Sequence, residues 1–218
     1  MAVSPTVLRT LPIFESLDNT RLAPIARVAS LRNAPRGTVV VREGDRTDSV
    51  YFVINGTLKV SVSDDEGREV ILTILGTGDL FGEMGVVDNN PRSATVTATQ
   101  SADLVTIAKA DFQQCMMNNF DVSLFIMRNL AHRLRQADRK IESLALMDVY
   151  GRVARLLIDL SEEVEGRRIV IKKLTKQDIA KMIGASREMV SRVMTDLRGQ
   201  GLLDEMPEGI VLHGDFGQ

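Results

Sequence analysis

The sequence predicts an α+β protein: an N-terminal antiparallel β-roll, a long helix, and a C-terminal winged helix-turn-helix. Three observations support this prediction. Short runs rich in Val, Ile and Thr, punctuated by Gly, Asp and Asn, fill the first half of the chain. An apolar heptad follows in a stretch without Gly or Pro, and two short amphipathic segments joined at a glycine come after it. We expect domain boundaries at 1–112, 113–147 and 148–218.

The composition is that of a globular protein and argues against several classes. The 218 residues are 44% hydrophobic and 26% charged, which is ordinary for a soluble domain. No apolar run approaches the ~20 residues of a membrane span, and the N-terminus lacks signal-peptide features. Cys115 is the single cysteine, and His132 and His213 are the only histidines, so a cysteine-ligated cluster or a His-rich metal site is not expected. We therefore expect a cytoplasmic protein without a metal, and not a metal-dependent β-roll enzyme.

The first region runs from about residue 4 to 112 and begins with a short helical segment. Its strand-like runs are GTVVVREGD, SVYFVINGTLKVSVSDDEG, REVILTILGTGD and SATVTATQSADLVTIA. Strands of this length, separated by turn signals at this spacing, predict a small antiparallel barrel or roll.

The second region predicts one continuous helix from about Asp111 to Met147. Its apolar positions step alternately by three and four residues, as in a coiled-coil seam: Met127, Leu130, Leu134, Ala137, Ile141 and Leu144. A stripe this narrow indicates a dimerisation helix in a parallel homodimer. The alternative is a helix that packs only on its own roll.

The third region begins near Asp148, with Gly151 as a predicted hinge. We expect a helix from Arg152 to Val164, a turn at Glu165 and Gly166, the strand-like run RRIVIKK, and a closing hairpin around residues 208–209. The chain has a net charge of −2, but nine basic and three acidic residues between Arg167 and Arg198 give that stretch +6. Such a basic patch on an acidic protein suits phosphate binding, although a solvated basic face would look the same.

Two helices joined by a turn are predicted within this region. Thr175 and Asp178 form a capping-box-like start, Gly184 ends the first helix, and Ser186 caps a second helix that runs to Gly199. This is the helix-turn-helix pattern. The outward face of the second helix carries side chains that suit base edges, because Arg can hold guanine and Glu can accept from cytosine. These are Arg187, Glu188, Ser191 and Arg192.

At these residues the chain resembles the family of the catabolite activator protein and the fumarate–nitrate regulator, and the resemblance covers essentially its full length. The segment ASREMVSRV resembles that family's recognition helix. The resemblance implies a dimer on double-stranded DNA, reading an inverted repeat of GTGA-type half-sites ~34 Å apart. Ser191 follows the fumarate–nitrate branch, so the half-site stays open. The resemblance also implies DNA contacts from Thr175, Lys176, Gln177 and Ser186, and possible contact with RNA polymerase, which the short Glu162–Arg167 loop leaves open.

The stretch GEMGVVDNNPRSATV, residues 82–96, suits a cyclic phosphate diester. Arg92 can grip two phosphate oxygens, Ser93 can add a hydroxyl donor, and Glu83 can accept from a ribose 2′-hydroxyl. We expect a one-turn helix at 82–85 whose first N–H groups also face the anion. The alternative interpretation is that Glu83 and Arg92 simply pair with each other near a turn.

The same stretch resembles the family's phosphate-binding cassette, with Phe-Gly-Glu-Met at 81–84 and Pro-Arg-Ser-Ala at 91–94. The resemblance implies a cyclic-nucleotide-binding fold. The residues assigned to the ligand site are Gly82, Glu83, Met84, Arg92, Ser93, Ala94, Arg133, Ala137 and Asp138.

The chain departs from the family on the long helix, where cyclic-AMP-responsive members carry adjacent Thr and Ser. Ala137 and Asp138 stand there instead. Ala137 has no hydrogen-bonding side chain, and the Asp138 carboxylate suits the adjacent donors of guanine better than adenine. Cyclic AMP ranks first because the sugar-phosphate residues are intact, and cyclic GMP and cyclic di-GMP stay open. Further alternatives are that Asp138 pairs with Arg135 or Arg139, that the chain is ligand-independent, and that it is a cyclic-nucleotide module controlling a protein partner.

Overall fold

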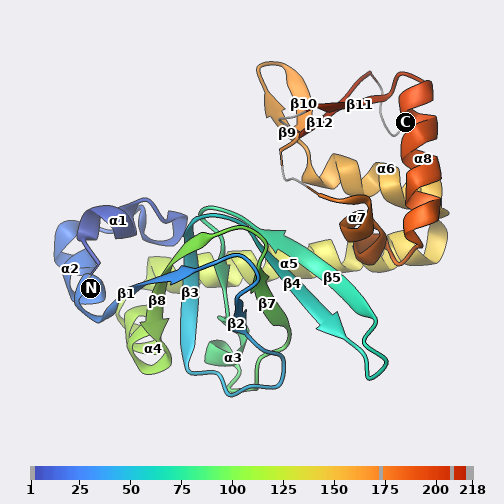
Figure 1. Cartoon of the computed structure of the whole chain (residues 1–218). Coiled ribbons are helices and arrows are strands. Elements are labelled where there is room, and N and C mark those ends of the chain that lie inside the picture. Colours follow the sequence, from blue (N-terminus) through green and yellow to red (C-terminus); the bar gives the residue numbers. More distant parts are fainter. Residues whose placement is uncertain (1–2, 172–173, 207–208, 215–218) are drawn as a thin grey trace. The chain divides into compact units, whose positions relative to one another are not determined.

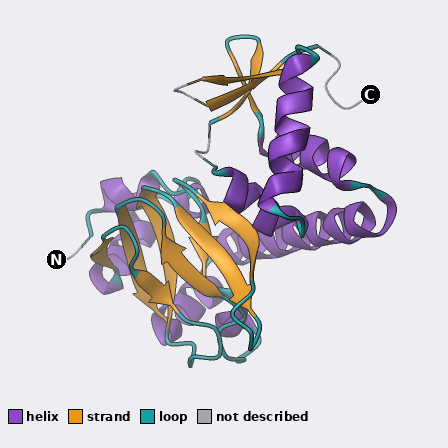
Figure 2. Ribbon diagram, turned by 45° about the vertical axis from the view of Figure 1, so that its right-hand side comes forward, coloured by secondary structure: helices purple, strands orange, loops and turns teal. Residues whose placement is uncertain are grey.

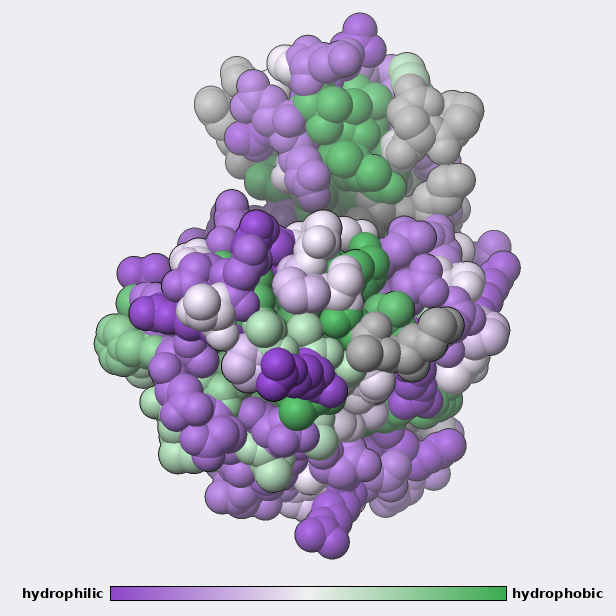
Figure 3. Space-filling model, turned by 90° about the vertical axis from the view of Figure 1, so that its left-hand side faces the viewer, coloured by the Kyte–Doolittle hydropathy of each residue, from purple (hydrophilic) through white to green (hydrophobic). Residues whose placement is uncertain are grey.

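The computed structural model describes residues 3–171, 174–206 and 209–214 and divides the chain into two compact units, Met1–Arg133 and Leu134–Gln218. Figure 1 shows the elements of each unit. No helix in the described ranges is long and apolar enough to cross a bilayer. Hydrophilic residues cover much of the face in Figure 3, with apolar patches between them, as is normal for a protein surface.

Short helices open the first unit. They are α1 (Pro5–Arg9), the 3-10 turn η1 (Pro12–Phe14) and α2 (Asn19–Val28). Capping side chains start both α-helices: Ser4 accepts from the Val7 N–H, and Asp18 accepts from the Arg21 N–H.

Two antiparallel four-stranded sheets form the roll, which confirms the predicted fold class. One has the order β1 (Ser30–Ala34), β8 (Ala102–Ala108), β3 (Ser49–Asn55), β6 (Leu80–Phe81). The other has the order β2 (Val39–Val41), β7 (Thr95–Ala98), β4 (Leu58–Ser63), β5 (Glu69–Leu75). Neither β1 nor β6 was among the predicted runs. The segment SLRNA of β1 exposes four of its five residues, and β6 has two residues, so neither carries a periodic signal.

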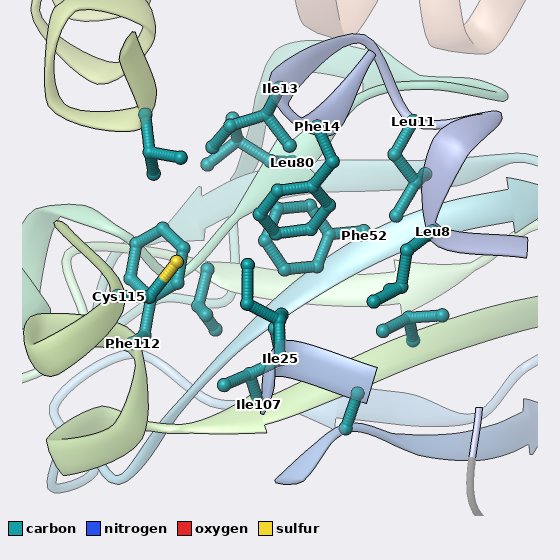
Figure 4. Close-up of a cluster of buried hydrophobic side chains, with 14 of the residues drawn as sticks. Leu8, Leu11, Ile13, Phe14, Ile25, Phe52, Leu80, Ile107, Phe112 and Cys115 are labelled. Atoms are coloured by element: carbon teal, nitrogen blue, oxygen red, sulfur yellow. The ribbon is translucent and has the colours of Figure 1, made fainter. Parts of the chain in front are cut away.

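The first unit has two buried clusters. One joins the N-terminal helices and α4 (Lys109–Asn118) to β3 and β8, where Phe52 lies 5.3 Å from Phe14 and 5.9 Å from Phe112 between ring centroids (Figure 4). The other fills the roll, where Tyr51 stacks on Phe81 at 4.9 Å. The second cluster underlies the candidate ligand site, since β3 and β6 carry both rings.

The predicted single helix from Asp111 to Met147 is wrong in one respect. The chain forms α4 and then α5 (Phe120–Leu146), separated by the extended residue Asn119. The buried Asn119 side chain donates to the Cys115 carbonyl at 2.9 Å, and Ser123 donates to the Met116 carbonyl at 2.8 Å. Asn and Ser side chains thus satisfy helix-end carbonyls, which ends α4 without Gly or Pro.

Most of the predicted seam is exposed in the isolated chain. Met127, Leu134, Ile141 and Leu144 are each at least half exposed. Leu130 differs, because it packs against the core of the first unit. The stripe on α5 therefore remains an uncovered apolar surface for most of its length.

The second unit begins with the end of α5 and contains a helical core beside a small sheet (Figure 2). Its helices are α6 (Val149–Leu160), α7 (Lys176–Ile183) and α8 (Arg187–Gly199). The sheet order is β11 (Leu203–Met206), β12 (Gly209–Leu212), β10 (Arg167–Val170), β9 (Glu162–Val164). Residues from all three helices share one core with β10 and β11. Lys172 and Lys173 of the predicted strand-like run, and Glu208 of the predicted hairpin, lie outside the described residues.

Two predicted boundaries in this unit are corrected. The break after α5 lies at Met147 and Asp148, while Gly151 lies inside α6 and donates its N–H to the capping Asp148 side chain. The helix predicted to reach Val164 ends at Leu160, because residues 162–164 pair with β10 as a strand. The turn was predicted correctly: Glu165 and Gly166 both have positive φ, the conformation of a two-residue type I′ hairpin.

Candidate ligand pocket and nucleic-acid interface

The segment after β6 brings the predicted phosphate-binding residues together. Gly82 has φ +83°, and a Cβ there would collide with the Arg92 guanidinium. A Cβ at Gly85 would collide with the Thr47 side chain and the Asn90 carbonyl. Both glycines are therefore required by close packing. The one-turn helix predicted at 82–85 is displaced: α3 spans Met84–Val87, because the left-handed Gly82 cannot belong to a right-handed helix.

Glu83 is a buried carboxylate with one oxygen unused. Its side chain is 1% exposed, and its Oε1 accepts from Arg133 Nη1 at 2.9 Å. Arg133 is fixed in turn by donating to the Leu80 carbonyl at 2.6 Å. Oε2 is buried and has no hydrogen-bond partner within the described chain. Burial raises the pKa of Glu83, while Arg133 and Arg92 act in the opposite direction.

Arg92 is a buried guanidinium in the same segment. Nη1 donates to the Gly82 carbonyl at 3.1 Å, and Nη2 donates to Asp48 at 3.1 Å and to Ser49 at 3.4 Å. The guanidinium also lies 5.7 Å from the centre of the Tyr51 ring. Glu83 and Arg92 do not pair with each other; each has its own partner, so the alternative interpretation is wrong.

The remaining predicted ligand residues divide between the two units. Ser93 donates to Met84 Sδ at 3.7 Å, and both side chains are exposed beside the buried Ala94. Ala137 and Asp138 are exposed positions of α5 within the second unit. Sequence reasoning missed Asp48, Ser49 and Tyr51. They contact Arg92 from the start of β3 and the residue before it, more than 40 residues earlier, and no local pattern links them.

The helix-turn-helix has the predicted local structure. Thr175 and Asp178 form a complete capping box, with Thr175 Oγ1 accepting from the Asp178 N–H at 3.1 Å and Asp178 Oδ2 accepting from the Thr175 N–H at 3.0 Å. Gly184 has φ +64° and ends α7 in the left-handed conformation. The Ser186 hydroxyl accepts from the Met189 N–H and starts α8.

The predicted base-reading side chains lie at the N-terminal part of α8. Arg187, Glu188 and Arg192 are exposed, and Ser191 is half-buried. The pKa of Glu188 is lowered by its own backbone N–H, the Ser186 hydroxyl, and the charges of Arg187 and Arg192. Glu188 therefore stays an acceptor at neutral pH. Of the residues predicted to contact phosphates, Thr175, Gln177 and Ser186 are exposed, and Lys176 lies 3.8 Å from Glu205.

Within the described residues, no group of three His, Cys, Asp or Glu side chains could hold a metal ion. The first unit is a roll with a buried carboxylate and a buried arginine, and the second contains a capped helix-turn-helix. These features define a two-unit protein with a candidate small-ligand site and a nucleic-acid-binding fold. The family models match this division: "Cyclic nucleotide-binding domain" covers residues 31–119, and "Crp-like helix-turn-helix domain" covers residues 151–213.

Curated relatives extend this match over most of the chain. The chain is 35% identical over 191 residues to the cAMP-activated global transcriptional regulator CRP of Haemophilus influenzae, covering 84% of each chain. It is 35% identical over 187 residues to the cAMP-activated regulator Vfr of Pseudomonas aeruginosa, covering 81% of this chain and 86% of that one. A solved structure of the c-di-GMP-responsive regulator CLP of Xanthomonas campestris has a TM-score of 0.73 and 30% identity, covering 90% of this chain and all of that one. The chain belongs to the CRP/FNR family of transcription regulators.

Proposed function

We propose that the chain is a cytoplasmic homodimeric transcription regulator that binds an inverted-repeat DNA site when a cyclic nucleotide occupies its roll. The main support for the ligand site is Glu83 Oε2, which is buried and has no hydrogen-bond partner within the described chain. The buried guanidinium of Arg92 lies in the same short segment. A buried acceptor without a donor is costly, and a ligand hydroxyl would satisfy it.

The chemistry of a ribose cyclic phosphate fits these two groups. The 2′-hydroxyl is a donor for Glu83 Oε2, and the phosphate carries a negative charge that suits the Arg92 guanidinium. The Arg133 charge opposes the effect of burial and favours the ionised, accepting form of Glu83 by pairing with Oε1. Ser93 is exposed beside Met84 and supplies a further hydroxyl donor at the same segment.

The identity of the base is proposed from the relatives and from α5. Two relatives are named as cAMP-activated, which supports cyclic AMP as the first choice. A third is described as c-di-GMP-responsive. The exposed carboxylate of Asp138 suits the paired N–H donors of guanine, so cyclic GMP and cyclic di-GMP are the second candidates.

The DNA-binding proposal depends on α8 and on the exposed stripe of α5. A parallel pair of α5 helices would cover the stripe and place two α8 helices about one DNA turn apart, ~34 Å. Ligand binding controls this spacing only if the nucleotide binds one arrangement more tightly than the other. Ligand-free protein that binds its operator at full affinity would contradict this control.

Calorimetric titration of nucleotide-stripped protein with cyclic AMP, cyclic GMP and cyclic di-GMP tests the ligand site. We expect micromolar or tighter binding of one nucleotide. Arg92→Ala should weaken it by roughly 100-fold or more, since two charge-assisted contacts are lost. Arg36→Ala, at an exposed site of the same unit, is the control.

The 2′-deoxy analogue of the bound nucleotide tests Glu83 without any mutation. We expect roughly tenfold weaker binding, because Oε2 again lacks a donor. Absence of heat with all three nucleotides would contradict the cyclic-nucleotide proposal and leave the family's helix-turn-helix unaffected.

A further inference from the structure

The guanidinium nitrogens of Arg92 differ in how many hydrogen-bond acceptors they have. Nη2 has two hydrogens, and two acceptors lie on it: Asp48 Oδ1 at 3.1 Å and Ser49 Oγ at 3.4 Å. Nε is buried and has no partner within the described chain. Nε and Nη2 form one edge of the guanidinium, and such an edge binds an oxyanion through two parallel hydrogen bonds. Nη2 of this edge therefore contacts a carboxylate and a hydroxyl, whereas Nε has no partner within the described chain.

The two acceptors on Nη2 differ in how easily their side chains can move away from Arg92. Ser49 is buried, and its hydroxyl lies 2.9 Å from the Tyr51 hydroxyl, so its place is fixed by the roll. The Asp48 side chain is 77% exposed, whereas the Arg92 side chain is 4% exposed. An exposed carboxylate can turn into water at little cost, but a buried guanidinium cannot lose its counter-ion without a replacement.

We infer that Asp48 is an internal anion that occupies the phosphate-binding edge of Arg92 in the ligand-free chain and is displaced when the phosphate binds. This inference rests on the proposed function, because it assigns the regulation of affinity at the same site. The exchange replaces one negative charge with another, so Arg92 keeps a counter-ion in both states. Asp48 therefore lowers the affinity for the nucleotide while it stabilises the empty site.

The environment of Asp48 keeps it charged for this role. The Ser49 hydroxyl lies 2.6 Å from Asp48 Oδ1 and lowers the pKa of Asp48, and the Arg92 charge acts in the same direction. The carboxylate therefore competes with phosphate throughout the neutral pH range. The other groups in direct contact with the guanidinium are neutral: they are the Gly82 carbonyl, the Ser49 hydroxyl and the Tyr51 ring. The Glu83 carboxylate interacts with the Arg92 charge but forms its ion pair with Arg133, so Asp48 is the carboxylate paired with Arg92.

The test compares Asp48→Asn with Asp45→Asn. Asp45 is an exposed acid of the same loop whose side chain is not a partner of Arg92, so both variants lose one negative charge from the same segment. Each protein is stripped of nucleotide and titrated with cyclic AMP, cyclic GMP and cyclic di-GMP. We expect Asp48→Asn to bind the nucleotide that wild type binds about two- to fivefold more tightly, and Asp45→Asn to match wild type.

A melting measurement supplies a second readout. Ligand-free Asp48→Asn should melt below ligand-free wild type, because Arg92 loses its counter-ion, and saturating nucleotide should raise its melting temperature by more than it raises that of wild type. Asp48→Glu, which keeps the carboxylate, should restore the wild-type affinity.

Each contrary result has a definite meaning. Weaker binding by Asp48→Asn would overturn the inference and make Asp48 a residue that positions Arg92 for the phosphate. Equal tightening in both variants would overturn it in favour of a general charge effect. If wild type binds and Asp48→Asn does not tighten, the inference alone fails. If wild type binds none of the three nucleotides, the proposed function fails and the inference fails with it.

Discussion

At the scale of single residues, spacing along the sequence predicted which side chains of the roll form a candidate site, but not which side chains they contact. The pattern around Glu83 and Arg92 predicted a site, and the structure buries both side chains, although most residues between them are exposed. Spacing did not predict their contacts, since Asp48 lies 44 residues before Arg92 and Arg133 lies 50 residues after Glu83. The resemblance assigned Arg133 to the site but not to Glu83, and it did not point to Asp48. Such contacts follow from strand register and from the path of α5, which local propensity does not encode.

The buried carboxylate gives the roll a pH-dependent stability. Burial raises the pKa of Glu83, so the folded chain binds this proton more tightly than the unfolded chain. Its contribution to stability is present below the ordinary glutamate range and is lost as the pH rises through the raised pKa. Glu83→Gln does not titrate, so its stability relative to wild type should improve between about pH 5 and about pH 7.5 in urea unfolding.

Glu43→Gln makes the same chemical change at an exposed site of the first unit and is the matched control. A constant difference between wild type and Glu83→Gln across that range would show that Glu83 does not titrate abnormally.

The single thiol is predicted to be inert in the folded protein. Burial raises the pKa of Cys115 to about 11, despite its contact with Asn119. The thiolate is the reactive form, so iodoacetamide at about pH 8 should leave the native thiol largely unmodified and alkylate it after denaturation. Mass spectrometry of both samples measures this, and rapid alkylation of native protein would contradict it.

At the scale of elements, the sequence predicted whether a segment is a helix or a strand better than it predicted the residues at which the element begins and ends. The long strands, both helices of the helix-turn-helix and most of the long helix appear, because each carries a clear period or capping residues. The wrong boundaries lie where a side-chain hydrogen bond or strand pairing sets the end of an element. A buried Asn separates α4 from α5, and strand pairing converts residues 162–164 from predicted helix to β9.

The Asn119 hydrogen bond at the junction of α4 and α5 is expected to contribute measurably to the free energy of unfolding. Asn119→Ala removes the donor to the Cys115 carbonyl and leaves a buried acceptor unsatisfied. We expect a loss of about 1–2 kcal/mol in the free energy of unfolding, measured by urea titration. The neighbouring Asn118 is exposed, so Asn118→Ala is the control and should have an effect below about 0.5 kcal/mol. Equal losses in both variants would show that the Asn119 hydrogen bond does not hold the junction.

At the scale of the whole molecule, α5 is the element that both units share, since its residues up to Arg133 belong to the first and those from Leu134 to the second. Its uncovered stripe is the feature that a single chain leaves unexplained. A self-pairing surface with a heptad period fits a second copy of the same helix, because both copies then bury the same positions.

The double variant Leu134→Arg with Ile141→Arg tests this pairing. Both side chains are more than half exposed in the isolated chain, so the substitutions should leave each unit folded. Two charges on each helix would face their copies across the seam. We therefore expect sedimentation to report a dimer for wild type and a monomer for the double variant. Operator affinity should fall by at least about 100-fold, because one half-site contact replaces two. Arg135→Glu, an exposed change one position off the stripe, should keep the dimer. A wild-type monomer that binds an inverted repeat with full affinity would refute the assignment of the stripe to dimerisation.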